Sequence, residues 1–244
     1  MVFSWLSSYG PVQSKLHPLH FRKDGVCKKC RPVYPKGIGF FMNNRSNLRI
    51  YRRFAPLYDR FMYSWTAGSR RKTIELLDLK PGDRLFIPGV GTGLDLPFVP
   101  SETLTTAVDP SPMMLRQALS KYDSPVGFLI MDVQILAFPS GLFDAVLINL
   151  ILSVVPDGAI AMEEIWRVLK PGGRVVIFDK FLPESSSLSS VRLLLGKLIR
   201  QIGTDPNRRL STIIQEVPEA LVLADQPVLL NGQYRIILLS KPMV

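Results

Sequence analysis

Three glycines at alternate positions, Gly89, Gly91 and Gly93, follow a short apolar run and have the spacing of a ligand-binding loop. Glycine allows a tight turn and lets a ligand lie directly against the backbone. The backbone amides that follow such a loop point toward whatever sits above the end of the strand. A glycine-rich loop alone is weak evidence for a nucleotide site, so its meaning depends on the acids and strands around it.

Two acids lie where a nucleoside site would need them. Asp109 follows the apolar run Thr103–Val108, and Asp132 follows the next run, Val126–Met131. The first acid is placed to bind the two hydroxyls of a ribose, and the second to accept a hydrogen bond from an adenine amino group. Taken alone, Asp132 is better explained as a residue that caps a turn. Together with the glycine loop, the two acids form a set at the carboxyl ends of strands, where doubly wound sheets bind ligands.

The residue after the third glycine separates two kinds of nucleoside ligand. Dinucleotide-binding loops have a further glycine at this place, which packs the helix closely beneath a pyrophosphate, and this chain has Leu94. A ligand without a pyrophosphate fits better, so the loop favours S-adenosylmethionine over NAD. Methyl transfer from a sulfonium mainly requires alignment and a dry site, and the sequence offers no side chain that stands out as a catalytic base.

An alternation of strands and helices positions these residues. The predicted strands are Arg84–Pro88, Thr103–Val108, Val126–Met131, Phe143–Ile148 and Arg174–Phe178. The predicted helices are Ser69–Leu77, Met113–Tyr122, Ala159–Leu169 and Leu188–Ile202. Two further extended runs, Val222–Leu230 and Gln233–Leu239, meet at Asn231-Gly232, a strong hairpin signal. We therefore expect an α/β fold, a Rossmann-like, doubly wound, mostly parallel seven-stranded sheet with a C-terminal antiparallel hairpin strand.

These motifs resemble those of the class I S-adenosylmethionine-dependent methyltransferases over about residues 50–240. The matching segments are Gly89–Gly93, Val108–Ser111, Met113–Leu115, Asp132 with Phe138-Pro139, Phe143–Val146 and Leu169–Gly173. The resemblance is closest to the bacterial phosphatidylethanolamine N-methyltransferases and the quinone-biosynthesis methyltransferases. The first group shares the segments Gly89–Leu94 with Leu96-Pro97, Tyr58–Phe61 and Gly68–Arg71.

The resemblance implies a donor site and an activity. The residues expected around the donor are Tyr58, Gly89, Gly91, Thr92, Gly93, Asp109, Pro110, Met114, Asp132, Val133 and Asn149. The implied reaction is methyl transfer from S-adenosyl-L-methionine to a small-molecule or lipid acceptor, with the amine of phosphatidylethanolamine as the candidate. The alternatives are a quinone-ring or other small-molecule methyltransferase, and a non-catalytic or nucleic-acid-binding member of the same fold.

Three positions in this site have a second interpretation. Tyr58 is equally well explained as a packed helix residue, and Asn149 is better explained as a buried turn asparagine. The family usually has an acid two residues before the first glycine, which helps to hold the donor's amino group, and this chain has Ile87 there. Either donor binding is weaker, or Asp95, just past the loop, compensates for that acid. A catalytically silent member of the fold is a further alternative.

Charge divides the chain unevenly. Residues 1–72 contain 15 Lys and Arg against two acids, whereas residues 73–244 contain 15 against 18. A block of this kind attracts anionic lipid headgroups or nucleic acid, or it is a solvated extension without a partner. Nucleic acid is the less favoured partner, because the block forms no known nucleic-acid motif. The predicted helix at Leu188–Ile202 is also basic, and it is better explained as core-facing than as membrane-lying.

The composition changes near residue 42. We expect a basic, irregular N-terminal extension over residues 1–41 and a methyltransferase domain over residues 42–244. The domain is expected to have N-terminal helices at 42–80, the donor-binding core at 81–180, and acceptor-side helices with the hairpin at 181–244. No run is long and apolar enough to span a bilayer, and the first residues lack a signal-peptide pattern. We therefore expect a cytoplasmic protein, with membrane association as the open alternative.

The extension contains every His and Cys of the chain, as two pairs: His17, His20, Cys27 and Cys30. These are four potential zinc ligands. Their order matches no common zinc finger, and a tail can contain such residues by chance. The sequence therefore predicts no metal site, with a small zinc knuckle as the less favoured alternative.

Overall fold

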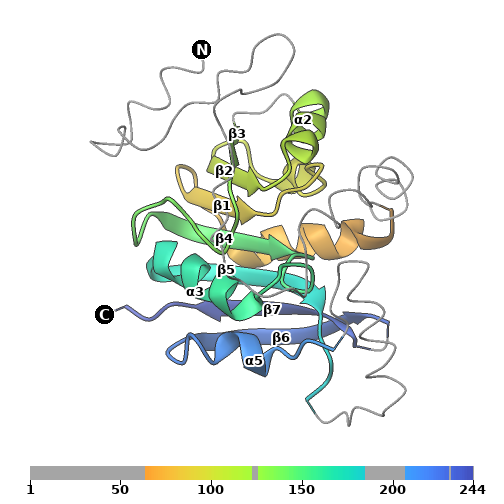
Figure 1. The fold of residues 1–244 in the computed structure, drawn as a ribbon, viewed down its shortest axis with the longest axis vertical. Coiled ribbons are helices and arrows are strands. Elements are labelled where there is room, and N and C mark those ends of the chain that lie inside the picture. The colour runs from red at the N-terminus through yellow and green to blue at the C-terminus, as the bar shows by residue number, and fades with distance from the viewer. Residues whose placement is uncertain (1–63, 123–125, 185–206, 231, 244) are drawn as a thin grey trace. The chain divides into compact units, whose positions relative to one another are not determined.

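The computed structural model describes residues 64–122, 126–184, 207–230 and 232–243, and a seven-stranded sheet lies at the centre of this part of the chain (Figure 1). The strands are β1 Arg84–Pro88, β2 Leu104–Asp109, β3 Val126–Ile130, β4 Phe143–Asn149, β5 Leu169–Lys180, β6 Leu221–Leu229 and β7 Tyr234–Ser240. The helices are α2 Pro112–Lys121, α3 Gly158–Val168, the short α5 Ser211–Ile214, the 3-10 turn η3 Leu96–Phe98, and a helix over residues 64–77, called the N-terminal helix below.

The strand order β3-β2-β1-β4-β5-β7-β6 is that of a doubly wound sheet. β1 pairs in parallel with β2 on one side and with β4 on the other, so the winding reverses between β1 and β4. β7 lies between β5 and β6 and is antiparallel to both, which confirms the predicted hairpin with one antiparallel strand. Ligands of such sheets bind outside the carboxyl ends of the strands at the point of reversal.

The central strands are buried on both faces, which explains why the sequence has continuous apolar runs there instead of an alternating pattern. Leu85, Phe86 and Ile87 of β1 are at most 1% exposed. The ring of Phe86 stacks on that of Phe143, with centroids 4.8 Å apart. Leu85 and Ile87, which point to the other face, join an apolar cluster that includes Leu77 of the N-terminal helix.

Two element boundaries differ from the sequence prediction by more than two residues. The N-terminal helix already includes residue 64, before the predicted start at Ser69. β5 begins at Leu169 and not at Arg174, because the segment predicted as a turn pairs with β4 at its first residue before the register shifts. Gly172, with a φ of 75°, still makes a turn inside this strand. Both differences arise from pairing and packing with distant segments, which local sequence patterns do not contain.

Candidate active site

The glycine loop leaves β1 with three residues in the left-handed region. The φ angle is 64° at Gly89, 55° at Gly91 and 83° at Gly93, which side chains other than glycine rarely permit. The amide of Val90 donates to the carbonyl oxygen of Val108 at 3.0 Å, so the loop is tied to the end of β2. The alternate spacing of the glycines is therefore a requirement of the backbone.

At two of these glycines a side chain would also clash with a neighbouring residue, and at the third it would not. A Cβ at Gly89 would lie 2.5 Å from Cγ2 of Ile151, and a Cβ at Gly93 would lie 2.9 Å from Cε2 of Tyr122. A Cβ at Gly91 would meet no atom within 4 Å. The backbone at Gly91 is thus open where a side chain would stand, and a donor lying against the loop needs that space. The residues present fit the donor in this respect.

Asp109 binds the glycine loop with its own carboxylate. One oxygen accepts from the amide of Gly91 at 3.0 Å, and the other accepts from the amide of Ser111 at 2.8 Å. Burial raises the pKa of Asp109 to about 6, the charge of Asp132 adds to this, and the two amide hydrogen bonds oppose it. The predicted ribose-binding acid therefore lies directly beside the loop, at the carboxyl end of β2.

The turn between β2 and α2 contains Pro110 and leads to Met114, two further residues predicted to lie around the donor. Ser111 caps α2, because its Oγ accepts from the amide of Met114 at 3.4 Å. Met114 is 8% exposed, and Pro110, between Asp109 and the cap, is half-buried. Thr92, in the glycine loop itself, is buried. The structure thus brings these predicted residues to the same end of the sheet.

Asp132 follows β3 at this same edge. Its Oδ1 accepts from the backbone amide and from the side-chain amide of Gln134, at 3.0 and 3.2 Å. The side-chain oxygen of Gln134 accepts in turn from the amide of Asp157, just before α3, at 2.9 Å. Val133 is buried. Asp132 therefore caps a turn, as one interpretation of the sequence predicted. It is also close enough to Asp109 for its charge to raise the pKa of that acid.

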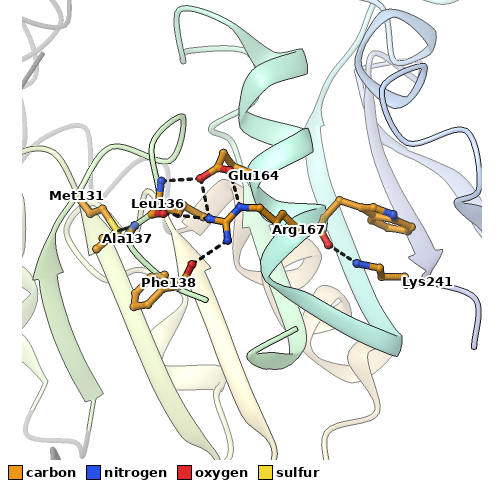
Figure 2. Close-up of polar contacts among 8 residues, drawn as sticks. Met131, Leu136, Ala137, Phe138, Glu164, Arg167 and Lys241 are labelled. Atoms are coloured by element: carbon orange, nitrogen blue, oxygen red, sulfur yellow. Dashed lines mark hydrogen bonds and ion pairs between the residues drawn. The ribbon is translucent and has the colours of Figure 1, made fainter. Parts of the chain in front are cut away.

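Helix α3 holds the loop after β3 through two charged side chains (Figure 2). The guanidinium of Arg167 donates to the carbonyl oxygens of Phe138 and Leu136, at 2.8 and 3.0 Å. Glu164 accepts from the amide of Leu136 at 2.8 Å and forms an ion pair with Arg167 at 2.7 Å. The hydrogen bond from Arg167 lowers the pKa of Glu164, so the pair is ionised at neutral pH. Sequence reasoning missed this clamp, since a Glu and an Arg three apart are common on any solvated helix.

A buried polar cluster lies between the N-terminal helix, the exit of the glycine loop and the end of β4. Arg70 donates to Asp95 at 2.6 Å, and both side chains are less than one-tenth exposed. The side-chain amide of Asn149 also donates to this oxygen of Asp95 at 2.6 Å, and it lies 3.3 Å from Oγ1 of Thr73. Thr66 accepts from Nε of Arg70 at 2.9 Å. The predicted burial of Asn149 is correct, and its partners were not foreseen.

The Gly68–Arg71 segment, noted in the sequence for its resemblance, has a structural purpose. Arg70 binds Asp95, and the guanidinium of Arg71 stacks over the ring of Phe98, 5.5 Å from its centroid. Both contacts hold the segment that leaves the glycine loop. The two adjacent arginines are visible in the sequence, but nothing in the local sequence identifies Asp95 and Phe98 as their partners.

Ile87 stands where the family usually has an acid. Its side chain is 1% exposed and packs in the apolar cluster with Leu85 and Leu147. An acceptor for the donor's amino group is therefore not offered from this position of β1. Asp95, the residue named above as a replacement, is already paired with Arg70 and Asn149.

The loop after β4 lies beside the glycine loop, where Ile151 packs against Gly89. Leu150 has a φ of 61°, and its amide donates to the carbonyl oxygen of Phe178 at 2.8 Å. Asp179, at the end of β5, is fully buried and accepts from the amide of Ser153 at 3.0 Å, and burial raises the pKa of Asp179. Arg208 donates to three carbonyl oxygens of this loop, those of Leu152, Val155 and Pro156. The loop is thus fixed from two directions.

Several predictions concern residues outside the described ranges: Tyr58, His17, His20, Cys27, Cys30, the helix at Leu188–Ile202 and the boundary between residues 1–41 and 42–244. Among the residues that the structure does describe, no helix has both the length and the apolar character needed to cross a membrane. In the same ranges, no three His, Cys, Asp or Glu side chains gather as they would around a metal ion.

Comparison with known sequences places the chain in one family. Residues 88–177 match the family described as a methyltransferase domain. The phosphatidylethanolamine N-methyltransferase of Cereibacter sphaeroides is 34% identical over 160 residues, which cover 64% of this chain and 78% of that protein. The ubiquinone/menaquinone biosynthesis C-methyltransferase UbiE of Teredinibacter turnerae is 31% identical over 195 residues, covering 71% of this chain and 78% of that protein.

Solved structures share the fold at lower sequence identity. The cyclase SpnF aligns with a TM-score of 0.67 and 17% identity, over 86% of this chain and 100% of that one. A phosphoethanolamine N-methyltransferase 2 of Haemonchus contortus, solved with phosphomonomethylethanolamine and S-adenosylhomocysteine, aligns with a TM-score of 0.58 and 18% identity, over 72% and 53%. Because a cyclase shares the fold, the fold alone does not define the reaction.

The reaction follows from the sequence relatives and from the site together. The glycine loop open at Gly91, the acid Asp109 bound to it, and the acid Asp132 at the next strand end are the parts that a nucleoside donor requires. The relatives that match most of the chain are methyltransferases. The chain belongs to the class I S-adenosylmethionine-dependent methyltransferases, and S-adenosyl-L-methionine is its methyl donor.

Proposed function

We propose that this enzyme methylates the amine of phosphatidylethanolamine. The observation that carries the proposal is the 34% identity, over 160 residues, to a phosphatidylethanolamine N-methyltransferase. The excess of Lys and Arg in residues 1–72 supports it, because the enzyme must work at a lipid surface and anionic headgroups attract such a region. The proposal includes this membrane contact and a cytoplasmic location.

The described residues have distinct roles in this reaction. When bound, S-adenosylmethionine supplies a methyl group already activated on a sulfonium, so the protein's task is alignment and exclusion of water. Asp109 and the backbone at Gly91 would hold the nucleoside end of the donor, and Asp132 would be the partner of its base. The loop after β4, fixed by Asp179 and Arg208, is the candidate acceptor side, where the half-buried Leu150 follows the strand. An amine acceptor has to lose its proton before its lone pair can attack.

The test is transfer of a radiolabelled methyl group from the donor to lipid. Vesicles of phosphatidylethanolamine with phosphatidylglycerol are compared with vesicles of phosphatidylethanolamine with phosphatidylcholine, using the full chain. We expect labelled phosphatidylethanolamine from the first kind in preference to the second, and none with an Asp109→Ala control. Labelling of neither vesicle by a chain that binds the donor would overturn this choice of acceptor.

A quinone ring is the second candidate acceptor. The similarity to a ubiquinone/menaquinone C-methyltransferase covers 195 residues, more of this chain than the phosphatidylethanolamine relative does, at 31% identity. The same assay with demethylmenaquinone in phosphatidylcholine vesicles separates the two. Label found in the quinone and absent from phosphatidylethanolamine would decide for this second candidate.

A further inference from the structure

The side-chain amide of Asn149 has a defined orientation. Its nitrogen lies 2.6 Å from Oδ1 of Asp95 and 3.3 Å from Oγ1 of Thr73. Oδ1 of Asp95 already accepts from the guanidinium of Arg70, so it requires a donor from its other neighbours too. The hydroxyl of Thr73 uses its proton on the carbonyl oxygen of Arg70, at 2.6 Å, so it also has only acceptor capacity left. Both neighbours require a donor, and the NH2 group of Asn149 must therefore face them.

This orientation directs the oxygen of the same amide away from both partners. Asn149 is 6% exposed, and its Oδ1 is buried without a hydrogen-bond partner among the described residues. Buried polar side-chain atoms are nearly always paired in folded proteins, and one that is not calls for an explanation. An N–H group from a bound ligand is the partner that such an acceptor lacks.

The unpaired oxygen belongs to a residue beside the glycine loop. β1 and β4 run in parallel with Phe86 opposite Val146, and continuing that register for three residues brings Asn149 level with Gly89. Ile151, two residues after Asn149, lies against the position of a Cβ on Gly89. The acceptor therefore stands at the carboxyl ends of the two strands between which the sheet reverses, where ligands bind.

We propose that Oδ1 of Asn149 accepts a hydrogen bond from the α-ammonium group of the donor, and so replaces the acid that the family has at the place of Ile87. The apolar burial of Ile87 leaves β1 without a side-chain acceptor, and β4 offers one instead. Arg70, Asp95 and Thr73 are positioning residues, because they fix the amide through its nitrogen. The inference depends on the donor and is independent of the choice of methyl acceptor.

The first test uses the unaltered chain and three ligands in calorimetric titration. The ligands are S-adenosylhomocysteine, its analogue in which hydrogen replaces the α-amino group, and methylthioadenosine, which lacks the whole amino-acid end. A hydrogen bond to a charged group predicts that the amino compound binds about tenfold or more tightly than its deaminated analogue. Equal affinity for these two would overturn the proposal. Failure of all three to bind would instead contradict the donor site itself.

The second test assigns the preference to one side chain. In Asn149→Leu the preference for the amino group is expected to disappear, while methylthioadenosine binds within about twofold of the unaltered chain. Gln134→Leu is the matched control, since it removes another buried amide at the opposite, Asp132 side of the site. It is expected to weaken all three ligands alike and to leave the amino preference intact.

Folding is checked in each variant by its cooperative thermal transition. If Asn149→Leu does not fold, Asn149→Ala is used, because it also lacks the oxygen and adds no apolar bulk. A folded Asn149 variant that keeps the full preference for the amino group would overturn the proposal, even if its overall affinity were reduced.

Discussion

At the scale of single residues, Asp109 serves the fold and the site with the same carboxylate. Its two oxygens accept from the amides of Gly91 and Ser111, and the side chain is buried. Burial raises its pKa from 3.8 to about 6, so ionising it disfavours the folded chain. The unliganded enzyme therefore loses stability as the pH rises from about 4 to about 6, and the site keeps an ionised acceptor for the ribose hydroxyls at neutral pH.

The raised pKa of Asp109 predicts a pH dependence of donor affinity. Hydroxyl groups donate to the carboxylate, so protonation below a pH of about 6 removes the acceptor. Calorimetric titrations between pH 8 and 5 should give a constant affinity above pH 7 and a progressive loss below pH 6. An Asp109→Asn variant should bind weakly at every pH. A flat profile in the unaltered enzyme would show that this carboxylate does not hold the donor.

Gly89 and Gly91 should respond differently to alanine, although both have a positive φ. At Gly89 the added Cβ meets Ile151, so we expect a loss of stability of more than about 2 kcal/mol. At Gly91 the added Cβ meets nothing, so the loss should stay near the backbone strain of about 1–2 kcal/mol.

Donor affinity should show the opposite order for these two variants. Gly91→Ala should weaken binding by about tenfold or more, because its methyl group occupies the space against which the donor lies. Urea unfolding and donor titration of both variants measure the two effects. Full donor affinity in Gly91→Ala would mean that the donor does not approach the loop on this side.

At the scale of elements, α3 holds the loop after β3, which also contains Asp132, the predicted partner of the adenine base. Arg167 binds the carbonyl oxygens of Leu136 and Phe138, as Figure 2 shows. Arg167→Met keeps the length of the side chain and removes these bonds, so it should cost about 1–3 kcal/mol of unfolding free energy and weaken donor binding.

Arg174→Met provides the control for this prediction. Arg174 pairs with Asp78 at 3.4 Å, and both side chains are more than two-fifths exposed. Its replacement should change stability by less than about 0.5 kcal/mol and leave donor affinity unchanged. If the two variants proved equally stable, the clamp on the loop after β3 would have no part in holding the site.

The strands and the loop could be predicted from sequence because their causes are local. Burial on both faces makes the centre of a strand such as β4, Ala145 to Ile148, continuously apolar, and positive φ angles demand glycine at alternate positions. The binding acids follow from their place after a strand. Arg70 could not be assigned to Asp95 in this way, because the pair joins residues 25 apart through tertiary packing. For the same reason, the sequence suggested burial of Asn149 and did not reveal its unpaired oxygen.

At the scale of the whole molecule, the excess positive charge and the predicted donor site lie in different parts of the chain. The acids that form the donor site all lie after residue 72, where acids slightly outnumber bases, and the excess of bases lies before it. Electrostatic attraction to a membrane is screened by salt, with a Debye length of about 8 Å at physiological ionic strength.

Binding of the full chain to vesicles should therefore depend on both lipid charge and salt. We expect sedimentation with vesicles that contain phosphatidylglycerol, a marked decrease when the salt is raised to about 0.5 M, and little binding to phosphatidylcholine alone. Donor affinity should change little over the same salt range, because Asp109 is buried and salt screens buried charges much less than exposed ones. Equal binding to neutral and anionic vesicles would contradict a role for the basic region.

The most direct test of this account is calorimetric titration of the full chain with S-adenosylmethionine and, separately, with NAD, beside an Asp109→Ala variant. We predict micromolar binding of S-adenosylmethionine, no comparable binding of NAD, and loss of donor binding in a variant that still folds. Donor binding that survives in Asp109→Ala, or its absence from the unaltered chain, would contradict the assignment of the donor site to the carboxyl edge of β1 and β2.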